Sequence, residues 1–341
     1  MNYTLHHLSH TDLDGYGCQM VTKRYFDSIL FYNSNYGKEI NECFNQILDT
    51  IQNSTVEKHL ILITDLNLTL DQAKEFQAKI SVAQQEILLL LLDHHKTGQE
   101  CFESFEWYYL DSSRCATKIT YDFFAALYGE DKELSAFVDV VNAVDIWLEN
   151  DPSFELGKVC MGLVSGAREV NKIMFPHENS AYIFSLLSDA QAYFTCNDAP
   201  IALDDATHQL KKKFFITSKN DTLSNLVSAY NVKLLTQNRD NMLIHYKQYK
   251  GILTYNIGNV SVIGNDFLNA NPDMDFFMDV TPKKTISLRS NGKVDVSQMA
   301  AHVANGGGHH NASGGLLSTF KDAFIYDTIK SNVMSIIAQK G

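Results

Sequence analysis

The feature that most constrains this chain is an apolar stretch, ILLLLL at 87–92, that runs directly into Asp93, His94 and His95. Six consecutive apolar residues are typical of a strand that is buried on both faces. A buried strand could end on Gly, Asn or Ser at a lower electrostatic cost than on an acid and two imidazoles. We therefore expect the end of this strand to bind a ligand.

The length of 341 residues and the hydrophobic content of 45% predict two domains. In the first 150 residues, short apolar runs alternate with amphipathic stretches, which indicates an α/β unit with a mostly parallel sheet. The region 155–232 has a helical pattern, and short strand-like runs begin near residue 240. The predicted division is an N-terminal catalytic α/β domain (1–200), a helical connector (201–238) and a smaller C-terminal α/β domain (239–341).

Several elements can be placed from the pattern. Strands are predicted in YTLHHLSH, KHLILIT and EILLLLL, and later in MLIHYKQY, GILTYNI and TISLRS. A first helix is expected from about Cys18. A second, DSSRCATKITYDFFAALYG, is expected to be capped by Ser112 or Ser113 and to end at Gly129. DVSQMAAHVA is expected to form a helix in the C-terminal domain.

The net charge of −12 argues against tight binding of long nucleic acid duplexes, which usually needs a basic surface. Small anionic substrates fit this charge better. The six cysteines form no CxxC pair, which favours reduced thiols in the cytoplasm. We expect no signal peptide and no membrane segment, because no apolar run approaches the length of a span.

Three predicted strands end in potential metal ligands. The first leads to His10, Asp12 and Asp14, the second to Asp65 and the third to the Asp93–His95 run. The carboxyl ends of parallel strands meet at one edge of a sheet, where ligands of open α/β folds bind. Carboxylates gathered there would repel one another, and two divalent cations about 3.5–4 Å apart would relieve that repulsion and activate water for phosphoester hydrolysis. Carboxylate and imidazole ligands without thiolate favour Mn²⁺, with Co²⁺, iron or Mg²⁺ as lesser candidates, over a structural zinc site.

Each of these positions also has a structural interpretation. Asp12 and Asp14 could be turn residues before Gly15, and Asp65 could cap a helix. His10 could simply end a strand, and Asp145 in NAVDIW could be an acid on the solvent side of a helix. The segment NGGGHHNASGG could be a flexible loop.

Taken together, four motifs resemble those of the DHH phosphoesterases. They are HTDLDG at 10–15, the strand-terminal Asp65, DHH at 93–95 and GGGHHNASGG at 306–315. They occur in family order along nearly the whole chain. The resemblance implies a DHH domain, a C-terminal DHH-associated domain and an active site in the cleft between them. The first motif and the length are most similar to the nano-RNase type, which degrades very short RNAs and often dephosphorylates pAp.

The resemblance also implies roles for individual residues. Asp93, His94, His95, Asp12 and Asp14 would be the catalytic group. His10, Asp12 and Asp65 would hold one metal, and Asp65 would bridge to a second that is held by Asp14, His94 and Asp145. Asp93 would orient an imidazole, and His95 would face the scissile phosphate. Many family members place the first histidine where this chain has Leu8, so His10 follows a RecJ-like spacing instead.

Substrate binding is expected from the C-terminal domain. Consecutive glycines allow backbone N–H groups to form an anion-binding nest, and arginine suits phosphate. A domain that holds the far end of a substrate would act as a length ruler for dinucleotides to about pentanucleotides. The predicted substrate-binding residues of this domain are Arg289, Ser290, Gly307, Gly308, His309 and Asn311, and the N-terminal domain is expected to add His95 and Arg114.

The resulting prediction is a phosphodiesterase with two Mn²⁺ per chain, replaceable by Mg²⁺ or Co²⁺, that converts very short RNAs to 5′-mononucleotides. Release of the 3′-phosphate of pAp is a further candidate activity. The expected partner is short RNA or a small nucleotide, and a homodimer is compatible with the sequence. The alternatives are a phosphodiesterase for cyclic or linear dinucleotides, a RecJ-like single-strand exonuclease, an inorganic pyrophosphatase, and a nucleotide-binding module without activity.

Overall fold

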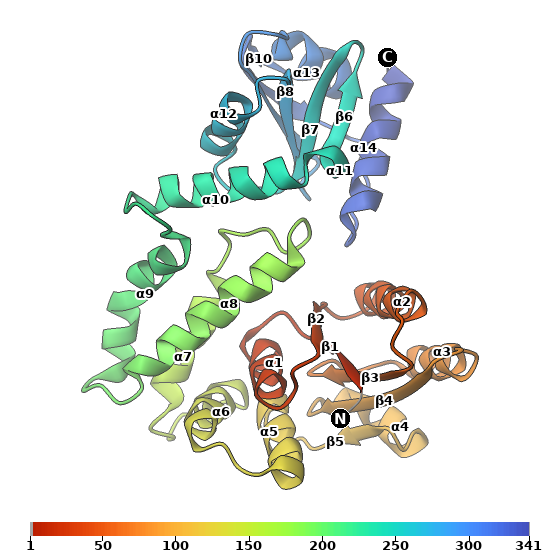
Figure 1. The fold of residues 1–341 in the computed structure, drawn as a ribbon, viewed down its shortest axis with the longest axis vertical. Helices are drawn as coiled ribbons and strands as arrows, with labels where there is room; N and C mark the ends of the chain where they lie inside the picture. Colours follow the sequence, from red (N-terminus) through yellow and green to blue (C-terminus); the bar gives the residue numbers. More distant parts are fainter. Residues whose placement is uncertain (1–2, 341) are drawn as a thin grey trace. The chain divides into compact units, whose positions relative to one another are not determined.

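The computed structural model describes residues 3–340, which form two compact units (Figure 1). Unit 1 comprises Met1–Ala167 and Ser180–Leu210, and unit 2 comprises Arg168–Asn179 and Lys211–Gly341. Each unit contains its own sheet. The expected α/β class, with a parallel sheet first and a second sheet later, is confirmed. The three-part division at residues 200 and 238 stays a prediction.

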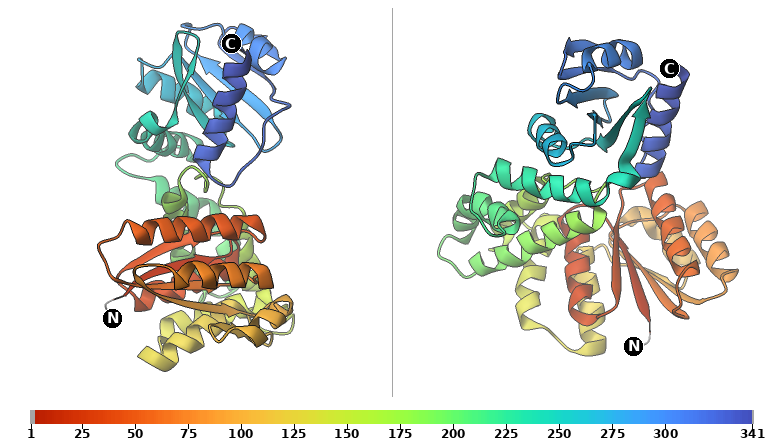
Figure 2. Two further views of the ribbon diagram at one scale, coloured as in Figure 1. Left: turned by 90° about the vertical axis from the view of Figure 1, so that its right-hand side faces the viewer. Right: turned by 45° about the horizontal axis from the view of Figure 1, so that its top comes forward.

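Unit 1 is built around a five-stranded parallel sheet in the order β2-β1-β3-β4-β5. Helices α1 and α5 lie on one face of this sheet and α2 and α3 on the other (Figure 2). The elements are β1 (Thr4–Ser9), α1 (Leu13–Tyr25), β2 (Ile29–Asn33), α2 (Lys38–Gln52), β3 (Lys58–Thr64), α3 (Leu70–Ser81), β4 (Glu86–Asp93), α4 (Gln99–Ser104), β5 (Tyr108–Leu110), α5 (Ala116–Tyr128), α6 (Lys132–Asp145) and α7 (Phe154–Ser165). Helices α8 (Pro176–Ala190) and α9 (Ala199–Phe215) each cross a boundary between the units.

The core of unit 1 follows from the apolar strands. Alternate residues of β3 and the end of β4 face α2 and α3, where the rings of Phe44 and Phe76 stack with centroids 3.7 Å apart. Leu91 and Ile63 are fully buried beside them. Burial of each such side chain contributes about 1.5–3 kcal/mol. This packing fixes the strands, and the strand ends therefore have fixed positions relative to one another.

Strand register delivers the polar residues to one edge. Ser9 at the end of β1 pairs with Thr64 at the end of β3, and Thr64 pairs with Leu92 of β4. The backbone N–H of Asp65 then donates to the carbonyl of Leu92 at 3.2 Å. A slip of one residue would turn every side chain to the opposite face of its strand. The residues that follow the three strands are thus held side by side.

Two helix boundaries differ from the predictions. Helix α1 begins at Leu13 rather than near Cys18, because the Asp12 carboxylate accepts from the Gly15 N–H and acts as the N-cap. Helix α5 is capped by Cys115, whose sulfur accepts from the Lys118 N–H. Ser113 instead binds the carboxylate of Asp111 in the preceding turn. Gly129 ends α5 as predicted.

Unit 2 contains a six-stranded mixed sheet in the order β10-β11-β9-β8-β7-β6, in which only β7 and β8 are parallel. Helices α12 and α13 contact the strands from β8 to β11, and α14 contacts β6 and β7. The elements are α10 (Leu223–Gln237), α11 (Arg239–Met242), β6 (Leu243–Tyr246), β7 (Tyr249–Tyr255), α12 (Val260–Ala270), β8 (Phe276–Val280), β9 (Thr285–Ser290), α13 (Val296–Ala304), β10 (Gly307–His309), β11 (Ala312–Leu316) and α14 (Tyr326–Lys340). Within residues 3–340, no helix combines the length and apolar character that a membrane span requires.

Gly15 provides a test of how closely the start of α1 packs against the backbone of His10, the residue that follows β1. A Cβ at this position would overlap the backbone carbonyl of His10, whereas a Cβ at Gly162 in α7 would meet nothing within 4 Å. We expect Gly15→Ala to lower the free energy of unfolding by about 1–3 kcal/mol. The control Gly162→Ala should raise it by about 0.5–1 kcal/mol, because alanine loses less backbone entropy in a helix. Urea unfolding measures both, and equal stability of the two variants would contradict the close approach.

Candidate active site

The structure brings together the metal ligands predicted from the sequence. Each side chain comes from the end of a regular element: β1 is followed by His10, β3 by Asp65 and β4 by His94, while α1 begins and α6 ends at this edge. The ligand atoms form three groups, each with mutual distances within 4.8 Å: Asp65, Asp93, His94 and His95; His10, Asp12 and Asp65; and Asp14, Cys115 and Asp145.

Asp65 is the residue common to two of these groups. Its side chain is only 2% exposed, and its backbone has φ of 55°, a left-handed conformation that costs an ordinary residue about 1–2 kcal/mol. This geometry turns the carboxylate away from the strand axis, between two histidines. Oδ1 lies 3.4 Å from His94 Nε2, and Oδ2 lies 3.6 Å from His10 Nδ1. Strain of this kind is retained where a site requires it.

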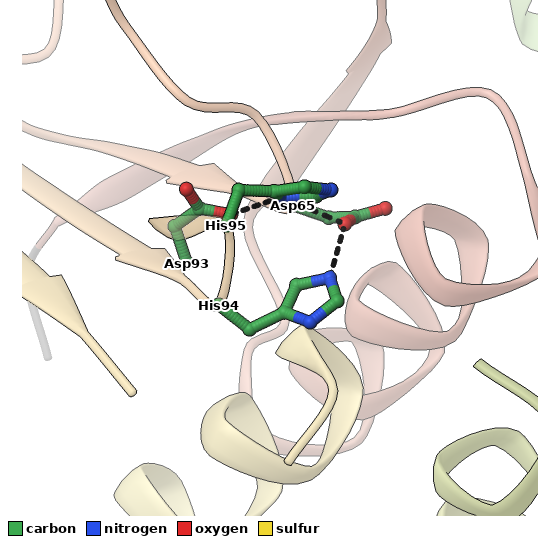
Figure 3. A group of neighbouring side chains, drawn as sticks. All are labelled: Asp65, Asp93, His94 and His95. Atoms are coloured by element: carbon green, nitrogen blue, oxygen red, sulfur yellow. Dashed lines mark hydrogen bonds and ion pairs between the residues drawn. The ribbon is translucent and has the colours of Figure 1, made fainter. Parts of the chain in front are cut away.

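One set of candidate ligand atoms, drawn from the first and third groups, surrounds His94. Its Nε2 lies 3.4 Å from Asp65, 3.5 Å from Asp145 Oδ2 and 3.7 Å from Asp14 Oδ2 (Figure 3 shows the contact with Asp65). These distances are long for hydrogen bonds. Ligands about 2.1 Å from a shared ion are themselves about 3–3.5 Å apart, so the spacing suits a divalent cation. Asp145 Oδ2 is buried and has no hydrogen-bond partner, which also fits a ligand atom.

The second group lies around His10. Its Nδ1 is 2.9 Å from Asp12 Oδ2, the distance of an ion pair, but it is not aligned for a hydrogen bond. His10 Nδ1 and Asp65 Oδ2 are therefore both buried without a hydrogen-bond partner. Orphaned buried polar atoms are rare and costly in folded proteins. The chemistry and spacing of these donors fit a second divalent cation.

Asp93 has a different kind of environment. The side chain is fully buried, Oδ1 accepts from His95 Nδ1 at 2.7 Å, and Oδ2 accepts from the Tyr108 hydroxyl at 3.2 Å (Figure 3 shows the pair with His95). Both oxygens are thus occupied by side-chain donors. A carboxylate with these contacts fixes the orientation of an imidazole. His95 Nε2 then points away from Asp93.

Asp14 is held by the start of α5. Its Oδ2 accepts from the Ala116 N–H at 2.8 Å and its Oδ1 from the Thr117 N–H at 2.7 Å. The first turn of a helix carries partial positive charge, which stabilises a carboxylate. The neighbouring Cys115 sulfur joins Asp14 and Asp145 in the third group. The sequence argument considered only carboxylates and imidazoles, so this thiol was missed.

The titration behaviour of the site reflects its excess of carboxylates. Burial raises the pKa of Asp65 well above its ordinary range, and Asp14 adds to the rise. Burial and Asp14 likewise raise the pKa of Asp145 to about 8. Burial alone would lower the pKa of His10, but Asp12 and Asp65 outweigh it and raise the pKa to about 10. The histidines do not supply enough positive charge to balance the carboxylates of the site. Bound divalent cations would supply the missing positive charge.

The predicted substrate residues of unit 2 lie at one end of its sheet. Arg289 in β9 pairs with Ala312 of β11, and the Ser290 N–H donates to the carbonyl of Asn311. Arg289 Nη2 donates to the Ser261 hydroxyl at 2.7 Å, which fixes the guanidinium. Gly307, Gly308 and His309 form the exposed edge strand β10, so the segment is a hairpin and not the nest that its glycines predicted. The outer N–H groups of an edge strand remain available to an anion.

Arg114 belongs to unit 1. Its guanidinium binds the carboxylates of Asp111 and Asp122 and contacts the Tyr109 hydroxyl at 3.4 Å. These contacts are sufficient to explain the residue structurally. Its role in substrate binding, like the other residue roles, stays a prediction.

Sequence reasoning also missed Tyr36. It follows β2, an element that was not predicted because ILFYN is half-buried and carries no strong alternation. The tyrosine hydroxyl lies 3.1 Å from His95 Nε2. The signal that could have found it is positional: a fourth parallel strand must end at the same edge as the other three.

Comparison with individual proteins of known sequence shows the family of the chain, although no family model matches it. It is 42% identical, over 341 residues, to a protein of Helicobacter pylori (strain ATCC 700392 / 26695) named 3′,5′-cyclic-nucleotide phosphodiesterase, with 97% of this chain and 98% of the relative covered. The chain belongs to the DHH phosphoesterase family. The resemblance inferred from its four motifs is confirmed, and the protein is a phosphohydrolase of this family.

Two further relatives extend the comparison. Oligoribonuclease NrnB of Bacillus subtilis (strain 168) is 26% identical over 318 residues, covering 91% of this chain and 72% of that protein. The crystal structure of an uncharacterized protein from H. pylori G27 is 41% identical and superposes with a TM-score of 0.90, covering 98% of this chain and 99% of the other. The DHH fold described above therefore extends over the full length of a solved relative.

The raised pKa values predict pH-dependent metal binding. Below pH 8, Asp145 in the metal-free protein is protonated, and Asp65 is protonated over a range extended upward from its ordinary pKa. A divalent cation must displace these protons, so its affinity should fall as the pH falls from 8 to about 6, by up to about tenfold per pH unit for each proton. Calorimetric titration with Mn²⁺ in two buffers of different ionisation enthalpy measures affinity and proton release.

The matched variants are Asp145→Asn and Asp139→Asn, because both positions lie on α6 and Asp139 is exposed and paired with Lys118. Asp145→Asn should weaken binding and flatten the pH dependence, whereas Asp139→Asn should leave both unchanged. An Mn²⁺ affinity of the wild type that is constant between pH 8 and about 6 would contradict this account.

Proposed function

We propose that the protein is a Mn²⁺-dependent phosphodiesterase that cleaves the 3′–5′ phosphodiester of very short oligoribonucleotides, from dinucleotides to about pentanucleotides, and releases 5′-mononucleotides. The observation that carries the proposal is that Asp65 lies between two sets of ligand atoms, one around His94 and one around His10. Two cations held at such groups would polarise the phosphoryl group and supply an activated water. Imidazole and carboxylate donors favour Mn²⁺ among the ions that form such pairs.

The distribution of charge supports a small anionic substrate. Unit 1 contains 29 acidic and 11 basic residues, a formal charge of −18, whereas unit 2 contains 11 acidic and 17 basic residues, a formal charge of +6. Unit 2 is therefore basic although the net charge of the whole chain is −12. We propose that Arg289 and the β10–β11 hairpin of unit 2 hold the end of the substrate remote from the scissile bond, where they would limit its length.

The side chains of unit 1 would handle the phosphoryl group. His95 donates Nδ1–H to Asp93, and its doubly protonated ring would also present Nε2–H as a donor to a non-bridging oxygen. Water adds its oxygen to phosphorus, the bond from phosphorus to the 3′ oxygen breaks, and that oxygen takes up a proton. The phosphate stays on the 5′ oxygen of the released nucleotide. Removal of the 3′-phosphate of pAp would need the same groups and is a further candidate activity.

A second candidate is the hydrolysis of 3′,5′-cyclic mononucleotides. The relative from H. pylori that carries the name of this activity aligns with nearly the whole chain. Cleavage of the bond from phosphorus to the 3′ oxygen in such a ring also yields a 5′-mononucleotide. The chemistry of the site is therefore the same in both cases, and the two candidates differ in how far the substrate extends.

The proposal is tested by product formation with Mn²⁺ on a panel: 5′-phosphorylated RNAs of two and five residues, a longer single-stranded RNA, 3′,5′-cyclic AMP, cyclic di-AMP, pAp and pyrophosphate. We expect the two shortest RNAs to be cleaved at least about tenfold faster than the longer one, with 5′-mononucleotide as the product. The double variant Asp93→Ala/His94→Ala should lose at least about a hundredfold in rate, because it removes a metal ligand and the residue that orients His95.

Asp71→Ala is the control, because Asp71 is an exposed acid in the first turn of α3. It should retain wild-type rates. Faster cleavage of the longer RNA would contradict the proposed preference for short substrates and favour a RecJ-like exonuclease. Turnover of cyclic AMP alone would establish the second candidate.

A further inference from the structure

Tyr36 lies in the segment between β2 and α2, at the same edge of the sheet as the metal ligands. Its ring centroid is 4.8 Å from that of His10 and 5.6 Å from that of His95. Its hydroxyl is 3.1 Å from His95 Nε2 and 3.4 Å from the carbonyl oxygen of Asp65. The residue is nevertheless 42% exposed. It therefore contacts the site on one side and solvent on the other.

The contacts of His95 show why this hydroxyl matters. Nδ1 is committed to Asp93, which is fully buried and also bonded to Tyr108. Nε2 is the ring nitrogen that remains for a substrate, and the Tyr36 hydroxyl lies beside it. A phosphoryl oxygen that approaches Nε2 must therefore also come within reach of the phenol. The hydroxyl can rotate to donate to that oxygen, because a phenol is both donor and acceptor.

We propose that Tyr36 is a further phosphate-binding residue, whose hydroxyl and His95 Nε2–H donate together to one non-bridging oxygen of the scissile phosphodiester. Two donors 3.1 Å apart can both reach a single oxygen at ordinary hydrogen-bond lengths. Their combined bonds strengthen as negative charge grows on that oxygen in the transition state. The proposal rests on the proposed function, since it requires a phosphodiester substrate.

The closing experiment compares Tyr36→Phe with the wild type, on whichever substrate of the panel the wild type hydrolyses. Phenylalanine keeps the ring against His10 and removes only the hydroxyl. We expect kcat/KM to fall about 10- to 100-fold, the effect of one hydrogen bond to a charged group. The affinity for Mn²⁺ should be unchanged, because no ligand atom is lost. The affinity for 5′-AMP in the presence of Mn²⁺, measured by calorimetry, should fall as well.

Tyr3→Phe is the matched control, because the Tyr3 hydroxyl also makes a hydrogen bond. It donates to Glu86 at the opposite end of the strands. Tyr3→Phe should leave kcat/KM unchanged. A second comparison adds Tyr36→Phe to His95→Ala. A further loss in the double variant, in 5′-AMP affinity as well as in rate, supports direct contact with the phosphate.

Three outcomes would overturn the proposal. Wild-type kcat/KM in Tyr36→Phe would show that the hydroxyl does not contact substrate. Loss of Mn²⁺ affinity in parallel with activity would show that Tyr36 supports the metal site and does not bind the substrate. No further effect in the His95→Ala background would mean that Tyr36 acts only by holding His95. The wild-type protein could also fail to cleave any phosphodiester while Tyr36→Phe still binds 5′-AMP more weakly than the wild type. That result would contradict the proposed function but support the contact between Tyr36 and phosphate.

Discussion

The buried carboxylate of Asp65 is the constraint on which the site depends. It is desolvated, faces Asp14 and Asp12, and retains an oxygen with no hydrogen-bond partner. A charge in this position is tolerated only if positive charge comes close to it. His10 and His94 lie at 3.6 and 3.4 Å from its two oxygens, but they are themselves arranged as ligands. The sheet and the strained backbone at Asp65 hold this carboxyl group in place, and the start of α5 holds the neighbouring Asp14.

The same edge of the sheet was predictable from the sequence because strand ends obey simple rules. Apolar runs fixed β3 and β4, parallel pairing brought their ends together, and the acids at those ends could then be expected to meet. Asp145 could be placed only by family resemblance, because its helix gives no sign of which face the acid occupies. The structure puts Asp145 Oδ2 3.5 Å from His94.

What escaped prediction has physical reasons as well. Asp12 and Asp14 look like turn residues, yet Asp12 caps α1 through the Gly15 N–H. Asp14 binds the first N–H groups of α5, a contact between residues that are distant in sequence. Tyr36 follows a strand too weakly patterned to be recognised. Net charge is a sum over the chain, so it could not show that unit 2 is basic while unit 1 is strongly acidic.

We propose that Asp65 serves two cation positions at once. This proposal is tested most directly by counting the Mn²⁺ ions bound per chain and recording their electron paramagnetic resonance spectrum, in the wild type and in Asp65→Asn. We expect two ions with the multiline spectrum of an exchange-coupled pair in the wild type and in the exposed control Asp49→Asn. Asp65→Asn should retain at most one ion and show no coupling. Two coupled ions in Asp65→Asn, bound with wild-type affinity, would show that Asp65 is not a shared ligand.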